Sequence, residues 1–274
     1  MRTSLETYAP EWDYTAQADY YRFRPNYARE AITSLCERAG ARGRGPDFLA
    51  ADIGAGTGNL ALLLAEQGVR CVAIEPNDAM RRLGVAQTSG LPIEWRAGTA
   101  ERTTLGTASV HLYAMGSSFN TTDQPLTLQE AHRVLVPGGH FSCLWNHRDL
   151  DDPMQREVEA IIRSVIPAYT HGSRRQDQTA AIEASGSFRV VVSTEHPQTV
   201  RQSFEQYLTA WRSVRNAFWD LRTEDGRRCF DEIERRIRQR FGRVDEVVQT
   251  YTTRMWVAVR LESGSARGAG CDGA

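Results

Sequence analysis

A glycine-rich turn between an apolar strand and an apolar helix is the feature that most constrains the fold of this chain. The segment ADIGAGTGNLALLLAEQG ends an apolar run at Asp52, turns through Gly54, Gly56 and Gly58, and continues as a leucine-rich helix. Glycines let the main chain approach a ligand closely, and the unpaired N–H groups at the start of a helix face the same place. The sequence therefore predicts a strand, a tight turn and a helix that hold a small polar ligand.

Apolar runs alternate with helical segments on both sides of this turn. Strands are expected over 48–53, 70–75, 93–98, 109–115 and 140–146, and helices over 25–40, 58–68, 77–87 and 123–135. This alternation predicts an α/β fold with a doubly wound parallel sheet. After residue 146 the pattern changes: helices are expected over 151–167, 201–214 and 225–241, and strands over 187–196 and 250–260.

The late helices indicate a cap inserted among the last strands. We expect an N-terminal helical lid over 1–45, a Rossmann-like cofactor-binding core over 46–149 and a helical cap insertion over 150–186. The remaining strands of the core are expected over 187–261 with cap helices at 200–242, followed by a disordered tail at 262–274, which is small and polar.

Composition narrows the class of partner. The 274 residues are 41% hydrophobic with a net charge of -1, which allows a sizeable core and gives no reason to expect nucleic acid or an anionic membrane surface. No apolar run approaches the roughly 20 residues of a spanning helix, no export signal is recognisable, and the five cysteines are scattered. We expect a cytoplasmic protein, a monomer or a homodimer, with no metal site. Every basic residue is Arg, which suggests a GC-rich coding bias and a bacterial source.

Spacing within the turn discriminates between ligands. A dinucleotide fingerprint has a third glycine where this chain has Asn59, and the Lys-Ser/Thr ending of a P-loop is missing. Glu75 ends the next strand, where a carboxylate is placed to accept hydrogen bonds from both hydroxyls of a ribose. The ligand is therefore expected to carry a ribose but no pyrophosphate.

With these motifs the chain resembles the class I S-adenosylmethionine-dependent methyltransferases, in particular their small-molecule group related to methyltransferase type 11. The resemblance covers about residues 14–261 and is carried by ADIGAGTG, AIEPNDAM, GTAERTTL and EAHRVLVPGGHFSCLWN. It implies S-adenosyl-L-methionine as cofactor and a Rossmann-like seven-stranded sheet, parallel with an antiparallel last strand. It further implies an enzyme that methylates an O, N or C atom of a small metabolite, plausibly an anionic carboxylate or phosphate or a natural-product intermediate.

The resemblance also assigns the cofactor's contacts. Asp52 and the turn bracket the methionine end, Glu75 and its neighbour hold the ribose, the residues after the third strand line the adenine, and the end of the fourth strand lies beneath the methyl group. The YYRFRP segment is expected to fold over the cofactor and to contact the methionine carboxylate. The implied cofactor-binding residues are Tyr20, Arg24, Asp52, Gly54, Ala55, Gly56, Gly58, Glu75, Pro76, Thr99, Ala100, Glu101, Met115, Gly116 and Ser117.

A base is needed where the acceptor must lose a proton. His147 follows the fifth strand at the ligand-binding edge of the sheet and is the first candidate, with Tyr21 and Tyr14 as alternatives. Many relatives have FHWFD after the fourth strand where this chain has FNTTD, which removes a histidine base there.

Guanidinium groups suit a carboxylate or a phosphate of the substrate. The arginines considered for this role are Arg148, Arg174, Arg175, Arg212 and Arg215. The candidate substrate-binding residues are Asn120, Asn146, Arg148, Arg212 and Trp211.

Three other functions remain open at the level of sequence. One is methylation of RNA or protein, and the near-neutral charge argues against RNA. Another is binding of S-adenosylmethionine without methyl transfer, since the cofactor-binding residues would be the same. A nicotinamide oxidoreductase is disfavoured by Asn59.

Overall fold

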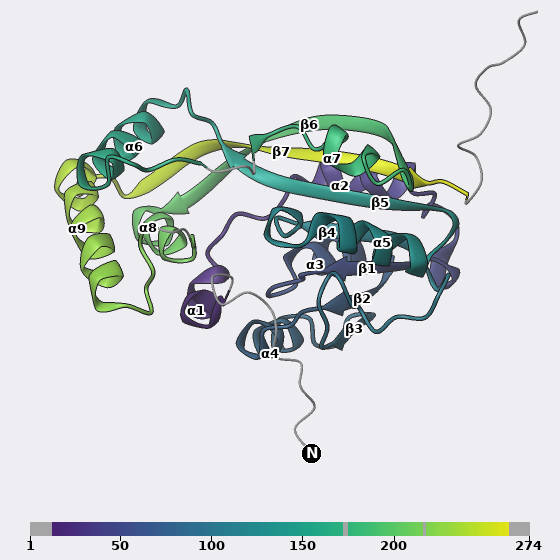
Figure 1. Ribbon diagram of the computed structural model, residues 1–274. Helices are drawn as coiled ribbons and strands as arrows, with labels where there is room; N and C mark the ends of the chain where they lie inside the picture. Colours follow the sequence, from purple (N-terminus) through teal and green to yellow (C-terminus); the bar gives the residue numbers. More distant parts are fainter. Residues whose placement is uncertain (1–12, 172–174, 216–217, 263–274) are drawn as a thin grey trace, which may run out of the picture.

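A seven-stranded mixed sheet runs through the computed structural model, which describes residues 13–171, 175–215 and 218–262 (Figure 1). The strands follow in the order β3-β2-β1-β4-β5-β7-β6, and β7 runs antiparallel to both of its neighbours. Their bounds are β1 Leu49–Ile53, β2 Arg70–Ile74, β3 Ile93–Arg96, β4 Val110–Gly116, β5 Leu135–Arg148, β6 Phe188–Ser203 and β7 Glu246–Arg260. The predicted doubly wound sheet with an antiparallel last strand is confirmed.

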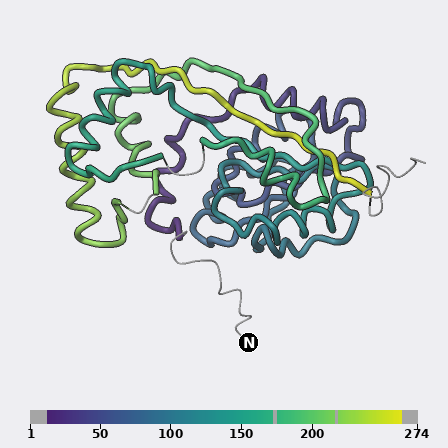
Figure 2. Tube along the Cα trace, turned by 45° about the horizontal axis from the view of Figure 1, so that its top comes forward, coloured from purple at the N-terminus to yellow at the C-terminus, as the bar shows by residue number. Residues whose placement is uncertain are grey.

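Helices cover both faces of this sheet and form a separate cap at one end of it (Figure 2). Their bounds are α1 Ala18–Tyr21, α2 Arg29–Arg38, α3 Asn59–Glu66, α4 Asp78–Gln87, α5 Gln124–Val134, α6 Pro153–Val165, α7 Thr179–Glu183, α8 Phe204–Arg212 and α9 Glu224–Phe241. No helix in the described ranges is long and apolar enough to cross a membrane.

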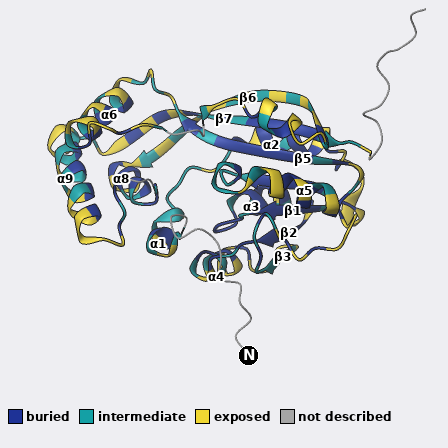
Figure 3. Ribbon diagram, viewed as in Figure 1, coloured by how far each residue is buried: buried dark blue, intermediate teal, exposed yellow. Residues whose placement is uncertain are grey.

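The apolar side chains form one core on each face of the sheet. On one face Leu128 of α5 and Ile182 of α7 pack with Phe141 of β5, and on the other Leu35 of α2 and Leu60 of α3 pack with side chains of β1, β2 and β4. The central strands are covered on both faces (Figure 3), as expected for parallel strands of a doubly wound sheet.

The cap has an apolar core of its own, built from α6, α8 and α9. Ile162, Tyr207, Trp211, Phe230 and Ile237 are buried there. The cap is attached through β5, β6 and β7, whose 14, 16 and 15 residues extend well past the five-residue β1.

Strand β6 is the element whose length the sequence pattern underestimates. It runs seven residues beyond the expected end at 196, because partly buried polar residues such as Gln198 and Gln202 alternate with exposed ones along an edge strand. Pro197 fits this position, since an edge strand has one side free of ladder hydrogen bonds. Consequently α8 begins at Phe204, three residues later than the helix expected over 201–214.

Two segments lie outside the roles expected from the predicted domains. Within the expected cap insertion over 150–186, α7 packs on β6 in the core of the sheet, because Ile182 is fully buried there. Within the expected lid over 1–45, α2 packs on the sheet beside α3. The predicted disordered tail over 262–274 lies outside the described residues, except for Glu262.

Shortening a buried side chain of the cap tests its packing. Ile162 is 0% exposed in the cap core, so Ile162→Ala is expected to lower the free energy of unfolding by about 2 to 4 kcal/mol. Urea denaturation measures this, with Val85→Ala as the control because Val85 is 48% exposed. Equal unfolding curves for the two variants would contradict the packing described here.

Candidate functional site

The glycine turn between β1 and α3 has the backbone shape that its sequence predicts. Gly54, Gly56 and Gly58 have φ angles of +65°, +59° and +88°, in the left-handed region that favours glycine. Gly58 is also needed for space, because a Cβ atom there would lie 2.9 Å from the ring of Trp95. The third glycine therefore allows α3, which begins at Asn59, to pack against β3.

Glu75 links the glycine turn to the end of β2. Its Oε2 accepts a hydrogen bond from the Gly56 N–H and its Oε1 accepts one from the Asn77 N–H, both at 2.8 Å. An ionised carboxylate has about four acceptor positions, so acceptor positions remain for two hydroxyls of a ligand. Burial raises the pKa of Glu75 to about 6, against the effect of these hydrogen bonds.

Asp52 ends β1 directly beneath the turn. Its Oδ2 accepts a hydrogen bond from the Ala61 N–H at 2.9 Å, which satisfies one of the free N–H groups in the first turn of α3. Burial raises the pKa of Asp52 to about 7, with a smaller contribution from the nearby charge of Glu75. Two buried carboxyl groups thus lie at adjacent strand ends beside the same turn.

A cavity opens at this edge of the sheet, between the glycine turn and the cap. The empty space is about 770 Å³ when open solvent at the mouth is included. The predicted residues that line it are Tyr21, Arg24, Asp52, Gly54, Ala55, Gly56, Gly116, Ser117, Asn146 and Arg148. The lining residues that the sequence analysis did not single out are Pro25, Tyr27, Asn59, Leu60, Ala210, Val214 and Tyr251.

Tyr27 is the missed residue nearest to the end of β4. A Cβ atom on Gly116 would lie 2.7 Å from the Tyr27 hydroxyl, and the hydroxyl is 3.1 Å from Ser117 Oγ. Burial raises the pKa of Tyr27, so the phenol stays neutral near pH 7. In the sequence Tyr27 lies two positions after the RP pair, and no motif of its own indicates the contact with Ser117.

The N-terminal segment that carries Tyr27 is held by side chains of the long strands. Asn146 Nδ2 donates to the carbonyl oxygens of Asn26 (2.7 Å) and Pro25 (3.2 Å), and the Ala28 N–H donates to Thr253 Oγ1 (2.8 Å). Asn146 Oδ1 accepts from Thr253 Oγ1 at 2.8 Å. Asn146 therefore lies at the cavity wall, and its amide holds the segment over the glycine turn.

Arg24 joins this segment to the cap. Its Nε and Nη2 donate to Oγ and the carbonyl oxygen of Ser213, both at 2.8 Å, and its Nη1 donates to the Tyr21 hydroxyl at 2.9 Å. The guanidinium also lies over the Tyr21 ring, 4.2 Å from its centroid. Arg24 lines the cavity, but all three of its nitrogen positions are used within the protein.

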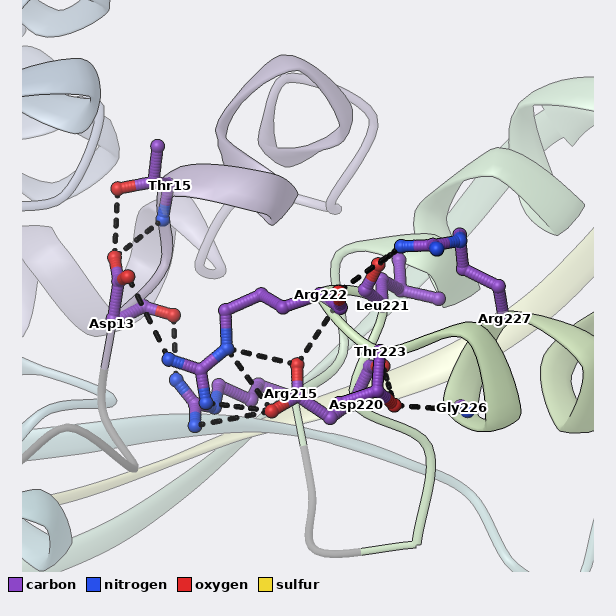
Figure 4. A network of polar contacts seen from close by, with 9 residues as sticks. All are labelled: Asp13, Thr15, Arg215, Asp220, Leu221, Arg222, Thr223, Gly226 and Arg227. Atoms are coloured by element: carbon purple, nitrogen blue, oxygen red, sulfur yellow. Dashed lines mark hydrogen bonds and ion pairs between the residues drawn. The ribbon is translucent and has the colours of Figure 1, made fainter.

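A second connection between the segment and the cap surrounds Asp13 (Figure 4). Its carboxylate lies 3.6 Å from Arg222 and its carbonyl oxygen accepts from Arg215. Asn77, two positions after Glu75, donates to Asp13 Oδ1 at 3.0 Å. This arrangement places Arg215 at the N-terminal segment, outside the main cavity.

His147 is not among the residues that line the main cavity. It lines a smaller neighbouring cavity with Glu159 and His171, and Asn146 and Arg148 line both cavities. The role of His147 as the base stays a prediction.

Three other predicted site residues also do not line the main cavity. Met115 is fully buried in the core on the α5 side, and Tyr20 packs against the cap core rather than lining the cavity. Tyr14 contacts the Tyr21 ring edge-on, with 6.1 Å between centroids, and does not line the cavity.

Two expected substrate-binding residues have other partners. Asn120 Oδ1 accepts from Trp145 Nε1 at 2.9 Å, on the opposite side of the sheet from the cavity. Arg212 forms an ion pair with Glu234 of α9 and lies over the Phe230 ring, so it stabilises the cap.

Trp211 lines the smaller cavity and stacks with Arg148. Arg175 donates to the Arg148 carbonyl oxygen, and Arg174 lies outside the described residues.

The residues expected at the adenine follow β3, at the same sheet edge as Glu75. Ala100 is buried and its carbonyl oxygen accepts from the Tyr113 hydroxyl, while Glu101 Oε1 accepts from the Asp123 N–H at 3.0 Å. Together with Pro76 and Thr99 they lie outside the lining of the main cavity. Their contact with an adenine stays a prediction.

Comparison with known proteins agrees with this geometry. Residues 51–143 match a family model described as a methyltransferase domain. An uncharacterized methyltransferase of Mycobacterium tuberculosis is 35% identical over 151 residues, which cover 54% of this chain and 57% of that protein. A ubiquinone/menaquinone biosynthesis C-methyltransferase of Rubrivivax gelatinosus is 36% identical over 94 residues, covering 34% of this chain and 37% of that protein.

Solved structures share the fold at low sequence identity. A candidate type II methyltransferase from Anaeromyxobacter dehalogenans superposes with a TM-score of 0.59 at 21% identity, covering 86% of this chain and 97% of that one. A candidate methyltransferase from an antibiotic biosynthesis pathway of Anabaena variabilis has a TM-score of 0.54 at 18% identity, covering 85% and 97%.

The fold and the glycine-turn site define a Rossmann-like methyltransferase domain. Residues 51–143 match the methyltransferase-domain family, the chain spans just over half the length of the uncharacterized methyltransferases that it matches, and its fold is that of the Rossmann-like methyltransferases. Glu75 fits the cofactor of that class, because its carboxylate retains acceptor positions for ribose hydroxyls after accepting from the Gly56 and Asn77 N–H groups.

The Glu75 carboxylate predicts a pH-dependent affinity for S-adenosylhomocysteine. Ribose hydroxyls donate to the ionised form, so affinity is expected to rise with pH through about 6 and to level off above pH 7. Glu75→Gln should weaken binding by about 10- to 100-fold and flatten this rise, because the amide has one acceptor oxygen. Calorimetry between pH 5 and 7.5 measures both. An unchanged affinity in the variant would remove Glu75 from the site.

Proposed function

We propose that this protein transfers a methyl group from S-adenosylmethionine to an O, N or C atom of a small metabolite. The observation that carries the proposal is the continuous cavity whose lining runs from Asp52 and Gly54 at the glycine turn to Arg148 and Tyr251 at the cap. The cofactor-binding end agrees with the family match, and the other end provides a place for an acceptor. The N-terminal segment and α8 enclose it, which favours a small molecule over a macromolecule.

Positioning is the main task that this mechanism leaves to the protein. The bound cofactor supplies an electrophilic methyl group on a sulfonium sulfur. Glu75 holds the ribose, and the main chain of the glycine turn provides the surrounding surface. The segment that carries Tyr21 and Tyr27 closes the cavity against water. Holding the acceptor in line with the bond that breaks accounts for much of the barrier reduction in such a displacement.

Proton removal has few candidates within the described cavity lining. No histidine is among those residues, and Tyr27 is kept neutral by its raised pKa. Asp52 accepts from the Ala61 N–H at the start of α3. These groups favour an acceptor that is already a nucleophile at neutral pH, such as a neutral amine or an ionised oxygen.

The wider setting is also part of the proposal. We infer a cytoplasmic bacterial enzyme, monomeric or homodimeric, that acts on an anionic metabolite or a natural-product intermediate. The net charge of -1 supports a small molecule over nucleic acid. A protein that binds the cofactor without methyl transfer is the alternative, and turnover separates the two.

Fractionated cell extract tests this function. The purified protein is incubated with methyl-labelled S-adenosylmethionine and, separately, with small metabolites, total RNA and total protein. Label in the small-metabolite fraction, together with S-adenosylhomocysteine release, is the expected result. Label in RNA or protein would contradict the proposed substrate class, and cofactor binding with no turnover on any fraction would identify a binding protein. Glu75→Gln serves as the variant with weakened cofactor binding.

A further inference from the structure

Arg148, the last residue of β5, carries a positive charge without an acidic partner. No carboxylate in the described ranges forms an ion pair with it, whereas Arg212 and Arg222 pair with carboxylates and Arg24 donates to Ser213. Its guanidinium lies 3.9 Å from the centroid of the Trp211 ring and 5.6 Å from that of Tyr251. Arginine stays charged at any relevant pH, so this charge is present in the folded protein.

Only neutral groups surround Arg148 within the described part of the chain. Its guanidinium interacts with the Tyr251 hydroxyl, Trp211 interacts with the Tyr207 hydroxyl, and the buried Arg148 Nε has no hydrogen-bond partner of ordinary geometry. A guanidinium can only donate hydrogen bonds. A buried charge that faces aromatic rings and hydroxyls alone is costly, so this group fits a ligand that brings negative charge and acceptor oxygens.

Arg148 and Tyr251 lie in the wall of the main cavity, and Trp211 lies in the wall of the smaller cavity that Arg148 also lines. Ala210 and Val214 of the cap line the main cavity with them. Asp52 and the glycine turn, where the cofactor is proposed to bind, line the same cavity. A molecule held by Arg148 would therefore face the cofactor across one cavity.

We propose that Arg148 binds a carboxylate of the methyl-accepting substrate, which makes that substrate a small organic acid. This inference rests on the proposed function. One guanidinium matches the single charge of a carboxylate and can hold both of its oxygens. Arg24, the other arginine among the described lining residues, already donates to Ser213 and Tyr21, so a doubly charged phosphate would have one of its charges uncompensated. Ala210 and Val214 offer an apolar surface to the carbon skeleton.

Acetate is the minimal probe of this site. The indole N–H resonance of Trp211, assigned with Trp211→Phe, reports on the group beside the Arg148 guanidinium. Titration of the protein saturated with S-adenosylhomocysteine is expected to shift this resonance with half-saturation at about millimolar acetate. Acetamide, which has the same shape without the charge, should leave the resonance unchanged.

Variants at two arginines make the test specific. Arg148→Met keeps the length of the side chain without its charge and should weaken acetate binding at least about tenfold, whereas Arg148→Lys should retain part of it. Arg212→Met is the matched control, because Arg212 faces α9 and not the cavity. Its acetate titration should match that of the unmodified protein.

Three results would overturn the inference. The first is an equal acetate-induced shift in Arg148→Met, and the second is inorganic phosphate that half-saturates at a lower concentration than acetate. The third is loss of S-adenosylmethionine binding in Arg148→Met by calorimetry, which would assign Arg148 to the cofactor's own carboxylate. Failure of the proposed function gives a different result: the unmodified protein would bind no S-adenosylmethionine, while acetate would still shift the Trp211 resonance in protein without S-adenosylhomocysteine.

Discussion

The site depends on the hydrogen bonds that hold the N-terminal segment against the long strands. Gln202 of β6 donates to the Phe23 carbonyl oxygen at 2.8 Å, Asn146 of β5 donates to that of Asn26, and Thr253 of β7 accepts from the Ala28 N–H. Three neighbouring strands thus fix one short stretch of chain. Because that stretch carries Tyr21, Arg24 and Tyr27, these hydrogen bonds decide which side chains close the cavity over the glycine turn.

The same segment connects the two halves of the cavity. Arg24 donates to Ser213 directly after α8. Asp13 interacts with Arg222 of the cap (Figure 4) and also accepts a hydrogen bond from Asn77, whose N–H donates to Glu75. Movement of the cap would therefore shift the residues at the ribose end of the site, and movement of those residues would shift the cap. Enzymes commonly use such closure to exclude water and complete the catalytic arrangement.

The sequence predicted the parts of the site that depend on local structure. Asp52, the glycine turn and Glu75 lie within one strand-turn-helix-strand unit, where strand ends and helix starts meet by geometry alone. His147 lies between Asn146 and Arg148, which line the main cavity, but it does not line that cavity itself, because successive residues of a strand point to opposite faces. Arg212 was indistinguishable from Arg148 by residue type, because its pairing with Glu234 depends on how α8 packs on α9.

The missed residues come from contacts that are distant in the sequence. Tyr27 reaches Ser117, 90 positions away, and Tyr251 reaches the cavity only because β7 inserts between β5 and β6. Neither contact has a local pattern that would indicate it. Fold class, in contrast, follows from alternation and turn chemistry that repeat along the whole core.

The central claim is that the glycine turn and Glu75 hold S-adenosylmethionine and not a dinucleotide. Calorimetric titration of the purified protein with S-adenosylmethionine and, separately, with NAD tests it most directly. We expect micromolar binding of S-adenosylmethionine and no binding of NAD. Binding of NAD alone would contradict the ligand assignment, and with it the roles given to Glu75 and Arg148.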